Sequence, residues 1–410
     1  MAKDQKQIVT APSEAPAPVP TRAITMLAIA AFASAANIRV CDPMLPDIAA
    51  EFSVSLGTAA RTTMAFLLTY GVFQVLIGPL GDRAGKYRVA AISCVGCGVV
   101  SAAHAFAVDF TTLVVLRGIA GVFAGAIIPL ALAWIGDVVA YEQRQGVIAR
   151  FLSGQILGVV FGQVAGGLLI DALGWRAAFV CIGVLHAVAG IGLLIELGSN
   201  PLTRARTAGG AFNIAGIAAG TIDLLRRPWV QIILVAGYFE AVAFHGALAF
   251  VASDLRVRFG LSAGQSGAML ALFGAGALVY AINAPWLVAR LGQRGLALQG
   301  SWIVSAALVV LALSPVVWTA PVAAAGLGLG FYMLHNTLQT NATQMAPEAR
   351  GLAVSQFAFW LFLGQSSGVW LAGIVVDTSG ARPVFLAAAA ALLAVAWWFC
   401  RMLERFRKNA

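Results

Sequence analysis

The chain carries too little charge for a protein dissolved in water. Only 10% of its 410 residues are charged and 60% are hydrophobic, whereas a soluble protein carries about 25% charged residues. So few polar groups cannot cover a surface that faces water, and we expect lipid to be the solvent. The sequence also lacks the alternating strands of about ten residues that build a transmembrane β-barrel.

Residues that carry chemistry are scarce and scattered. The five cysteines are Cys41, Cys94, Cys97, Cys181 and Cys400. Cys94 and Cys97 form a CxxC pair inside an apolar run without histidine or acidic neighbours, so we interpret them as packing residues. We find no nucleophile–base pair, metal cluster or ATPase motif. These absences disfavour a membrane enzyme and predict no cofactor and no metal, and the short tails disfavour a transporter-derived sensor.

Long apolar runs dominate what remains. They number about twelve, each of about 20 residues, the length that crosses a bilayer as a helix. Their approximate spans are 23–43, 58–78, 89–108, 111–135, 147–170, 175–197, 229–251, 264–288, 296–314, 319–342, 351–376 and 381–403. Lipid offers backbone groups no hydrogen-bond partner, so each run must be helical. The sequence therefore predicts an all-α integral membrane protein with twelve transmembrane helices.

The formal net charge of +9 indicates topology rather than binding to nucleic acid. If both termini are cytoplasmic, the segments on the other side of the membrane contain few basic residues: Arg61, Arg176, Arg256, Arg258 and Arg382. Most other arginines and lysines then lie in cytoplasmic loops, as the positive-inside rule requires. We predict a multi-pass protein of the cell membrane, a bacterial inner membrane, with lipid around it and no nucleic-acid partner.

The longest polar interruption, 198–228, divides the chain into two halves of six segments. The predicted parts are a disordered cytoplasmic tail (1–22), an N-terminal bundle (23–197), a cytoplasmic linker (198–228), a C-terminal bundle (229–404) and a tail (405–410). A short apolar piece within the linker is too short to span a bilayer, and we expect it at the membrane interface.

The two halves share a sequence register. DIAAEFSVSLG at 47–57 aligns with DLRVRFGLSAG at 254–264, and a DxxGxRxxF pattern begins at both Asp171 and Asp377. An internal repeat of six helices is typical of secondary transporters, whose two bundles rock around a central site.

The stretch GPLGDRAGKYR at 78–88 contains a Gly-Lys pair but is not a phosphate-binding loop, because Leu80 and Tyr87 occupy required glycine and Ser/Thr positions. It resembles the loop signature of the major facilitator superfamily, with Tyr87 at one basic position. A degraded copy, PWLVARLGQR, stands at 285–294. With the repeat, the resemblance covers nearly the whole chain and implies two pseudo-symmetric six-helix bundles.

The resemblance implies that this loop latches the two bundles on the cytoplasmic side and stabilises an outward-facing state. The expected latch residues are Gly78, Asp82, Arg83, Gly85, Lys86 and Arg88. We expect Asp82 to cap a helix or to pair with Arg83, Arg88 or another basic residue. The alternative is that the basic residues only anchor the topology.

Ionisable residues inside the apolar segments are candidates for function, because lipid makes them costly. Arg117 resembles an arginine of the family's fourth span that is linked to proton transfer. Arg39 and Asp42 in the first span lie at a similar depth, so the three are expected to form a charge cluster. A purely structural salt bridge between the spans is the alternative.

Glu240 lies near the middle of the seventh span and has no basic residue within a turn. A lone buried carboxylate of this kind is expected to bind and release a proton. We therefore predict proton coupling at Glu240, together with Asp42 and Arg117; a neutral, hydrogen-bonded acid is the alternative.

Polar residues in the remaining spans are candidates for contacts with substrate. His335 and Gln339 share one helical face and Asn336 flanks them, which favours a polar stripe toward a central cavity. The further candidates are Arg39, Asn37, Gln155, Asn283, Gln356 and Gln365. Hydrogen bonds between helices are the alternative role.

Together these features predict a monomeric antiporter that exports a drug or small metabolite in exchange for protons. The fifth span, LGVVFGQVAGG, resembles the family's antiporter motif but has Gly162-Gln163 where a Gly-Pro pair is expected. A proton symporter or uniporter that imports a small anionic metabolite, attracted by Arg39 and Arg117, therefore remains the second hypothesis.

Overall fold

The computed structural model describes residues 19–204 and 214–409. These residues form helices joined by short turns and contain no strand. The predicted disordered tail therefore lies mostly outside the described residues.

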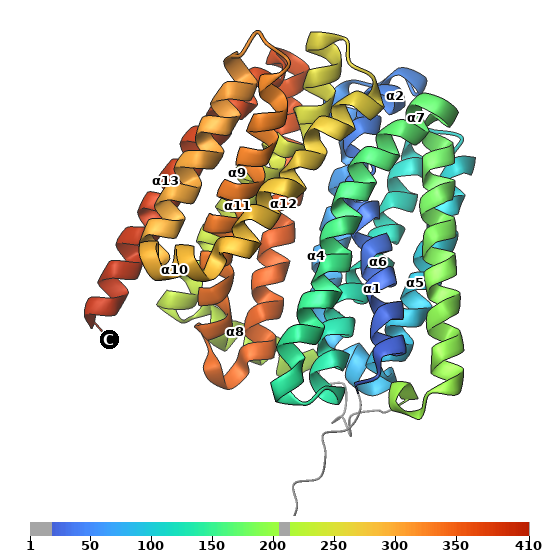
Figure 1. The fold of residues 1–410 in the computed structure, drawn as a ribbon, viewed down its shortest axis with the longest axis vertical. Helices are drawn as coiled ribbons and strands as arrows, with labels where there is room; N and C mark the ends of the chain where they lie inside the picture. The colour runs from blue at the N-terminus through green and yellow to red at the C-terminus, as the bar shows by residue number, and fades with distance from the viewer. Residues whose placement is uncertain (1–18, 205–213, 410) are drawn as a thin grey trace, which may run out of the picture.

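The first half forms the N-terminal bundle (Figure 1). Its elements are α1 (Thr21–Arg39), η1 (Asp42–Met44), α2 (Leu45–Glu51), α3 (Leu56–Ala59), α4 (Arg61–Ala84), α5 (Lys86–Ala103), η2 (His104–Phe106), α6 (Phe110–Val138) and α7 (Tyr141–Ser199). The linker contributes η3 (Pro201–Arg204) and α8 (Ile214–Leu225). The C-terminal bundle comprises α9 (Pro228–Phe259), α10 (Ala263–Leu313), α11 (Thr319–Gln344), η4 (Pro347–Ala349), α12 (Arg350–Ser379) and α13 (Ala381–Asn409).

Nine helical stretches of the described residues are long and apolar enough to cross a membrane. Two of them, α7 and α10, are interrupted by Gly174 and Gly292, whose φ values of +80° and +60° suit glycine. In α7 the chain reverses at Gly174, because Gly154 lies against Ala28 and Gly192 against Met26, at the same end of α1. Each of the twelve predicted apolar segments coincides with a helix or with one arm of these two.

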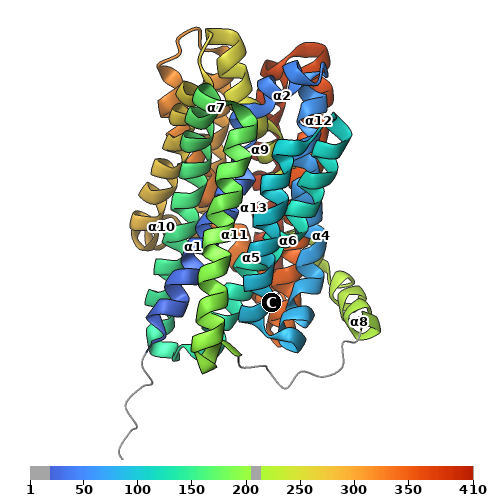
Figure 2. The same cartoon turned by 90° about the vertical axis from the view of Figure 1, so that its right-hand side faces the viewer.

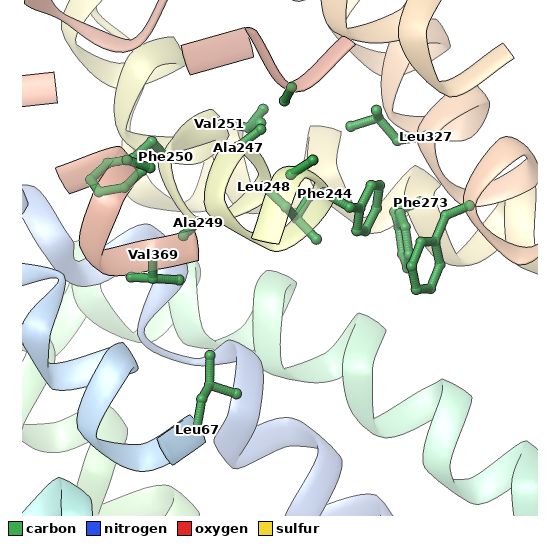
Figure 3. Close-up of a cluster of buried hydrophobic side chains, with 14 of the residues drawn as sticks. Leu67, Phe244, Ala247, Leu248, Ala249, Phe250, Val251, Phe273, Leu327 and Val369 are labelled. Carbon is green, nitrogen blue, oxygen red and sulfur yellow. The ribbon is translucent and has the colours of Figure 1, made fainter. Parts of the chain in front are cut away.

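The bundles meet along two seams, α4 with α12 and α7 with α10 (Figures 1 and 2). The predicted repeat appears in the turns: Gly380, like Gly174, has a positive φ, at +78°. Buried side chains of both bundles form one apolar cluster that includes Leu67 of α4, Phe244 of α9 and Val369 of α12 (Figure 3). We call the face where the described chain begins and ends the termini face.

Two aspartates close the face opposite the termini by capping helices of the other bundle. Asp171 of α7 accepts hydrogen bonds from the Ser262 hydroxyl (2.6 Å) and from the amides of Ala263 (2.9 Å) and Gly264 (2.7 Å), at the start of α10. Asp377 of α12 accepts them from the Ser55 hydroxyl and the Gly57 amide. The two caps are related by the sequence repeat, because Asp171 and Asp377 begin the same DxxGxRxxF pattern.

The α4–α12 seam opens toward the termini face. At Gly57 and Gly71 an added Cβ would collide with Gly373 and Phe362 of the other bundle, but at Gly78 it would meet no atom within 4 Å. Gly78 lies two turns beyond Gly71 on the same face of α4. The buried residues at the termini end of the N-terminal bundle also form a separate cluster. The bundles are therefore in close contact opposite the termini, and the contact that Gly57 and Gly71 make with α12 is not continued at Gly78.

Candidate functional site

Arg117 is held inside the N-terminal bundle by neutral acceptors. Its helix begins at Asp109, whose carboxylate accepts from the Thr112 amide (2.8 Å); this bond holds the pKa of Asp109 below its usual value. The Arg117 guanidinium is fully buried and donates to Asn37 Oδ1 (2.7 Å) and to the Thr62 carbonyl (3.4 Å). It also lies 4.3 Å from the centroid of the Phe66 ring.

Asn37 was predicted to face a substrate cavity, and the structure places it elsewhere. It is fully buried, and besides accepting from Arg117 it donates to Ser101 Oγ (3.0 Å) and to Cys97 Sγ (3.4 Å). Its side chain is thus occupied in joining three helices, which matches the alternative of hydrogen bonding between helices.

The three members of the predicted charge cluster make their direct contacts in two groups. Arg39 pairs with buried Asp42 at 3.5 Å, whereas Arg117 is hydrogen-bonded to Asn37. Arg39 keeps partial exposure, and the η1 turn that follows it contacts α9 and α10 of the C-terminal bundle. Arg39 therefore lies at the boundary between the bundles, while Arg117 lies within one of them.

Glu240 is not the lone carboxylate that the sequence predicted. Its Oε2 lies 3.0 Å from Nδ1 of His335, so α9 and α11 are joined by a carboxylate–imidazole pair. Glu240 is 0% exposed, and its second oxygen, Oε1, has no hydrogen-bond partner among the described residues. The partner was missed because it comes from another helix, 95 residues along the chain.

Aromatic rings enclose this pair. His335 stacks on Phe331 with centroids 4.9 Å apart, and Phe331 stacks on Phe244 at 4.2 Å. The edge of His245 meets the Phe331 ring at 5.5 Å. These rings give the pair a largely apolar surrounding, in which electrostatic interactions are stronger than in water.

The other predicted substrate residues are dispersed. Asn336 and Gln155 are half-buried, Gln339 and Asn283 are exposed, and Asn283 donates to the carbonyl of Val279 in its own helix. Gln356 is buried and donates to Thr221 of α8, so it ties the linker helix to α12 instead of facing a central cavity. Gln365 is buried.

The predicted latch loop forms its ion pairs within the N-terminal bundle. Lys86 Nζ lies 3.1 Å from Asp82 and 2.6 Å from Asp137, at the end of α6. Gly85 starts α5 with a φ of +95°. Arg83 and Arg88 are exposed. Asp82 thus pairs with a basic residue other than Arg83 or Arg88, as one of the expected options allowed.

Two crevices on the bundle surfaces do not involve these residues. One, of about 260 Å³, lies between α1 and the arms of α7 and is almost wholly apolar. The other, of about 300 Å³, lies between α10 and α13. Neither is lined by a predicted substrate residue.

Several polar contacts were not predicted. Asp137 was overlooked, and Asp171 and Asp377 were recognised only as markers of the repeat. Asp47 and Arg256 form a 2.5 Å ion pair between the bundles. The aligned stretches 47–57 and 254–264 were the available signal, because they contain Asp47, Arg256 and the residues that Asp377 and Asp171 cap.

Comparison with known proteins agrees with this architecture. The model of the Major Facilitator Superfamily matches residues 27–369. The multidrug transporter protein MdtP of Bacillus subtilis is 25% identical over 87% of this chain and 75% of its own length. The chloramphenicol resistance protein of Streptomyces lividans is 28% identical over 90% of this chain and 93% of its own.

Solved structures share the fold at low sequence identity. A bacterial homologue of the human lysosomal transporter Spinster, inward-facing and unoccupied, superimposes with a TM-score of 0.78 at 17% identity, covering 96% of this chain and 99% of the other. The nucleoside transporter NupG (D323A mutant) gives a TM-score of 0.74 at 13% identity, covering 93% and 99%. The chain belongs to the major facilitator superfamily and is a multi-pass membrane transporter of small molecules, not an enzyme.

Proposed function

We propose that this protein exports a small organic compound in exchange for protons, by alternating access. The observation that carries the proposal is the buried Glu240–His335 pair. A carboxylic acid beside a neutral imidazole, or a carboxylate beside an imidazolium, can hold one proton between them. A titratable pair enclosed in an intramembrane bundle is the usual form of a proton relay.

In alternating access, the seams between the bundles would open at one face of the membrane while they are closed at the other. In the described state the caps of Asp171 and Asp377 hold the face opposite the termini closed. Opening that face requires both caps to break, after which the latch loop would engage at the termini face. We propose that Asp42 and Arg117 support proton coupling by fixing the polar groups of the N-terminal bundle.

Substrate would enter between the bundles from the termini face, which we propose to be cytoplasmic in a bacterial inner membrane. Arg39 lies at the boundary between the bundles and is the leading contact candidate, followed by Asn336, Gln339 and Gln155. The names of the relatives, a multidrug transporter and a chloramphenicol resistance protein, favour export of a drug-like compound. We propose that the protein works as a monomer.

Arg39 also supports a second candidate function. A partly exposed guanidinium between the bundles suits an anionic metabolite, which a proton symporter or uniporter would import. The two functions differ in the direction of substrate flow relative to protons.

The test uses inverted membrane vesicles with an acid interior. Vesicles that contain wild type, Glu240→Gln or Asp254→Asn protein would be supplied with chloramphenicol and a panel of lipophilic cations and anions. Asp254 is a matched acid on the same helix, paired locally with Arg258 at 2.9 Å. We expect wild-type vesicles to accumulate a compound of this panel and to lose it when the pH gradient collapses. This accumulation should be absent in Glu240→Gln and retained in Asp254→Asn.

Substrate that leaves the vesicles together with protons would establish a symporter instead. Accumulation that is unchanged in Glu240→Gln would contradict the role proposed for this carboxylate, whatever the direction of transport.

A further inference from the structure

A crevice on the outside of the C-terminal bundle combines an apolar wall with a basic mouth. It lies between the second arm of α10 and α13, which run side by side (Figure 1). Its volume is about 300 Å³, and it is lined by Leu298, Ser301, Trp302, Leu393, Ala394 and Trp397. Trp302 is 64% exposed and Trp397 is 52% exposed, although both are large and apolar. In a membrane this surface faces lipid.

Arginines stand at the end of this crevice that is nearer the termini face. Arg401 follows Trp397 by one helical turn, and its guanidinium lies 3.6 Å from the centroid of that ring. Arg405 follows by one more turn. On the other wall, Arg294 precedes Leu298 by one turn. Because α10 and α13 are antiparallel here, all three arginines gather at the same end.

The charge at this mouth is not balanced by the protein. Arg294 pairs with Glu404 at 2.5 Å, and Arg407 donates to the neutral Gln293. Arg401 and Arg405 are exposed and have no acidic partner among the described residues. Two guanidinium groups therefore remain available to an anion that approaches from the membrane.

Aromatic residues place this mouth at the depth of lipid headgroups. Trp286 lies under Arg290, 5.3 Å from its guanidinium, and Trp229 stacks on Phe406 at 4.2 Å. Tryptophans beside arginines at one level are typical of the membrane–water interface. The crevice extends from this level toward the hydrocarbon core, by about 1.5 Å per helical residue.

We propose that this crevice binds one anionic phospholipid, with an acyl chain between Trp302 and Trp397 and the phosphate on Arg401 and Arg405. Charge complementarity selects the headgroup, and the apolar wall requires a chain. The N-terminal crevice, whose lining includes Cys181 and Leu185, provides a comparison site on the other bundle. The proposal is independent of the direction of transport and of proton coupling.

The test measures lipid retention by the purified full-length protein in detergent, using native mass spectrometry. Phosphatidylglycerol and phosphatidylcholine of equal chain length would be titrated into wild type and into Arg401→Gln/Arg405→Gln. A basic residue near an anionic headgroup changes affinity by about fivefold, so we expect the double variant to bind phosphatidylglycerol about 25-fold more weakly. Ala394→Trp, which fills the crevice, should also weaken binding.

Matched control variants separate lipid binding at this crevice from a general attraction between basic residues and anionic lipids. Arg150→Gln removes an exposed arginine at the termini face of the other bundle, and Leu185→Trp fills the other crevice; neither should change the affinity. Thermal unfolding and gel filtration would confirm that each variant is folded. Phosphatidylglycerol with brominated acyl chains should quench tryptophan fluorescence in wild type and less in Trp302→Phe/Trp397→Phe.

Three results would overturn the proposal. One is equal affinity for phosphatidylcholine and phosphatidylglycerol, which would remove the role of charge. Another is unchanged phosphatidylglycerol binding in both the arginine and the Ala394→Trp variants. The third is full competition by glycerol 1-phosphate, which has no chain and would show a site for free phosphate esters only.

Discussion

Glu240 Oε2 and His335 Nδ1 lie 3.0 Å apart in the interior of the C-terminal bundle, with a stacked phenylalanine on the imidazole. Glu240 is 0% exposed, and the His335 side chain keeps 11% exposure. The carboxylate and the imidazole are within hydrogen-bond distance, so a substitution of either one also removes the partner of the other. For the proposed function, the group to test is therefore the Glu240–His335 pair and not Glu240 alone.

His335 is expected to position Glu240 as well as to share its proton. His335→Ala should leave Oε2 without its partner, which costs about 1–3 kcal/mol for a buried polar group and should lower the unfolding temperature. His335→Gln can still donate a hydrogen bond and should restore most of that stability. Unfolding temperatures in detergent and transport in vesicles would be measured for both.

If His335 also carries the proton, His335→Gln should remain stable but lose transport driven by the pH gradient. Equal stability of the alanine variant and wild type would contradict the positioning role. Gln365→Ala, a buried polar residue of α12 outside the pair, serves as the control.

The reciprocal caps of Asp171 and Asp377 should set the balance between the two states. Hydrogen bonds to a charged acceptor contribute about 1.5–3 kcal/mol when shielded and less when partly exposed, as here. We expect Asp171→Asn/Asp377→Asn to raise the ratio of open to closed molecules at this face about tenfold, equivalent to about 1.4 kcal/mol.

Labelling of a cysteine introduced at Ala263 would measure this balance in a cysteine-free background. Ala263 is fully buried at the closed face, so a membrane-impermeant maleimide should label it faster in the double variant. Asp109→Asn, a cap within one bundle, provides the control and should leave the labelling rate at the parent value.

Asn37 should matter for stability and not for substrate affinity. Asn37→Ala removes the acceptor of the 2.7 Å bond from Arg117, a hydrogen bond to a charged group that is worth about 1.5–3 kcal/mol. We expect a lower unfolding temperature with an unchanged KM in the folded fraction. An increased KM at unchanged stability would indicate that Asn37 contacts the substrate. Asn336→Ala on α11 is the comparison variant.

Asp82→Asn should impair transport without preventing membrane insertion, because we propose that the latch loop acts on the conformational balance. The partly exposed Asp82–Lys86 pair contributes only about 0–1 kcal/mol, and Lys86 keeps its bond to Asp137. We therefore expect expression and unfolding temperature to stay close to wild type while the transport rate falls. Arg150→Gln is the control variant. A wild-type transport rate in Asp82→Asn would contradict the latch role of this loop.

Much of the fold could be predicted because it rests on local properties of the chain. The apolar segments follow from length and hydropathy, and the turns at Gly174 and Gly380 were visible as a repeated DxxGxRxxF pattern. The site was less predictable: Glu240, Arg39 and Asp42 were named correctly as buried or partly buried ionisable groups, yet Asn37 and Gln356 were assigned to a cavity that they do not face.

The sequence by itself determined that this chain is a membrane protein of two related halves, because composition, segment length and repeats require no knowledge of contacts. Only the tertiary structure decided which polar groups meet: Glu240 with His335, Asn37 with Arg117, Asp171 with the start of α10. The physical reason is that each residue turns a helix by about 100°, so small rotations of packed helices choose the partner of every buried polar group. Close approaches of glycines to neighbouring helices, such as Gly162 to Ala36 and Gly328 to Phe273, constrain those rotations, and they involve residues far apart in the chain.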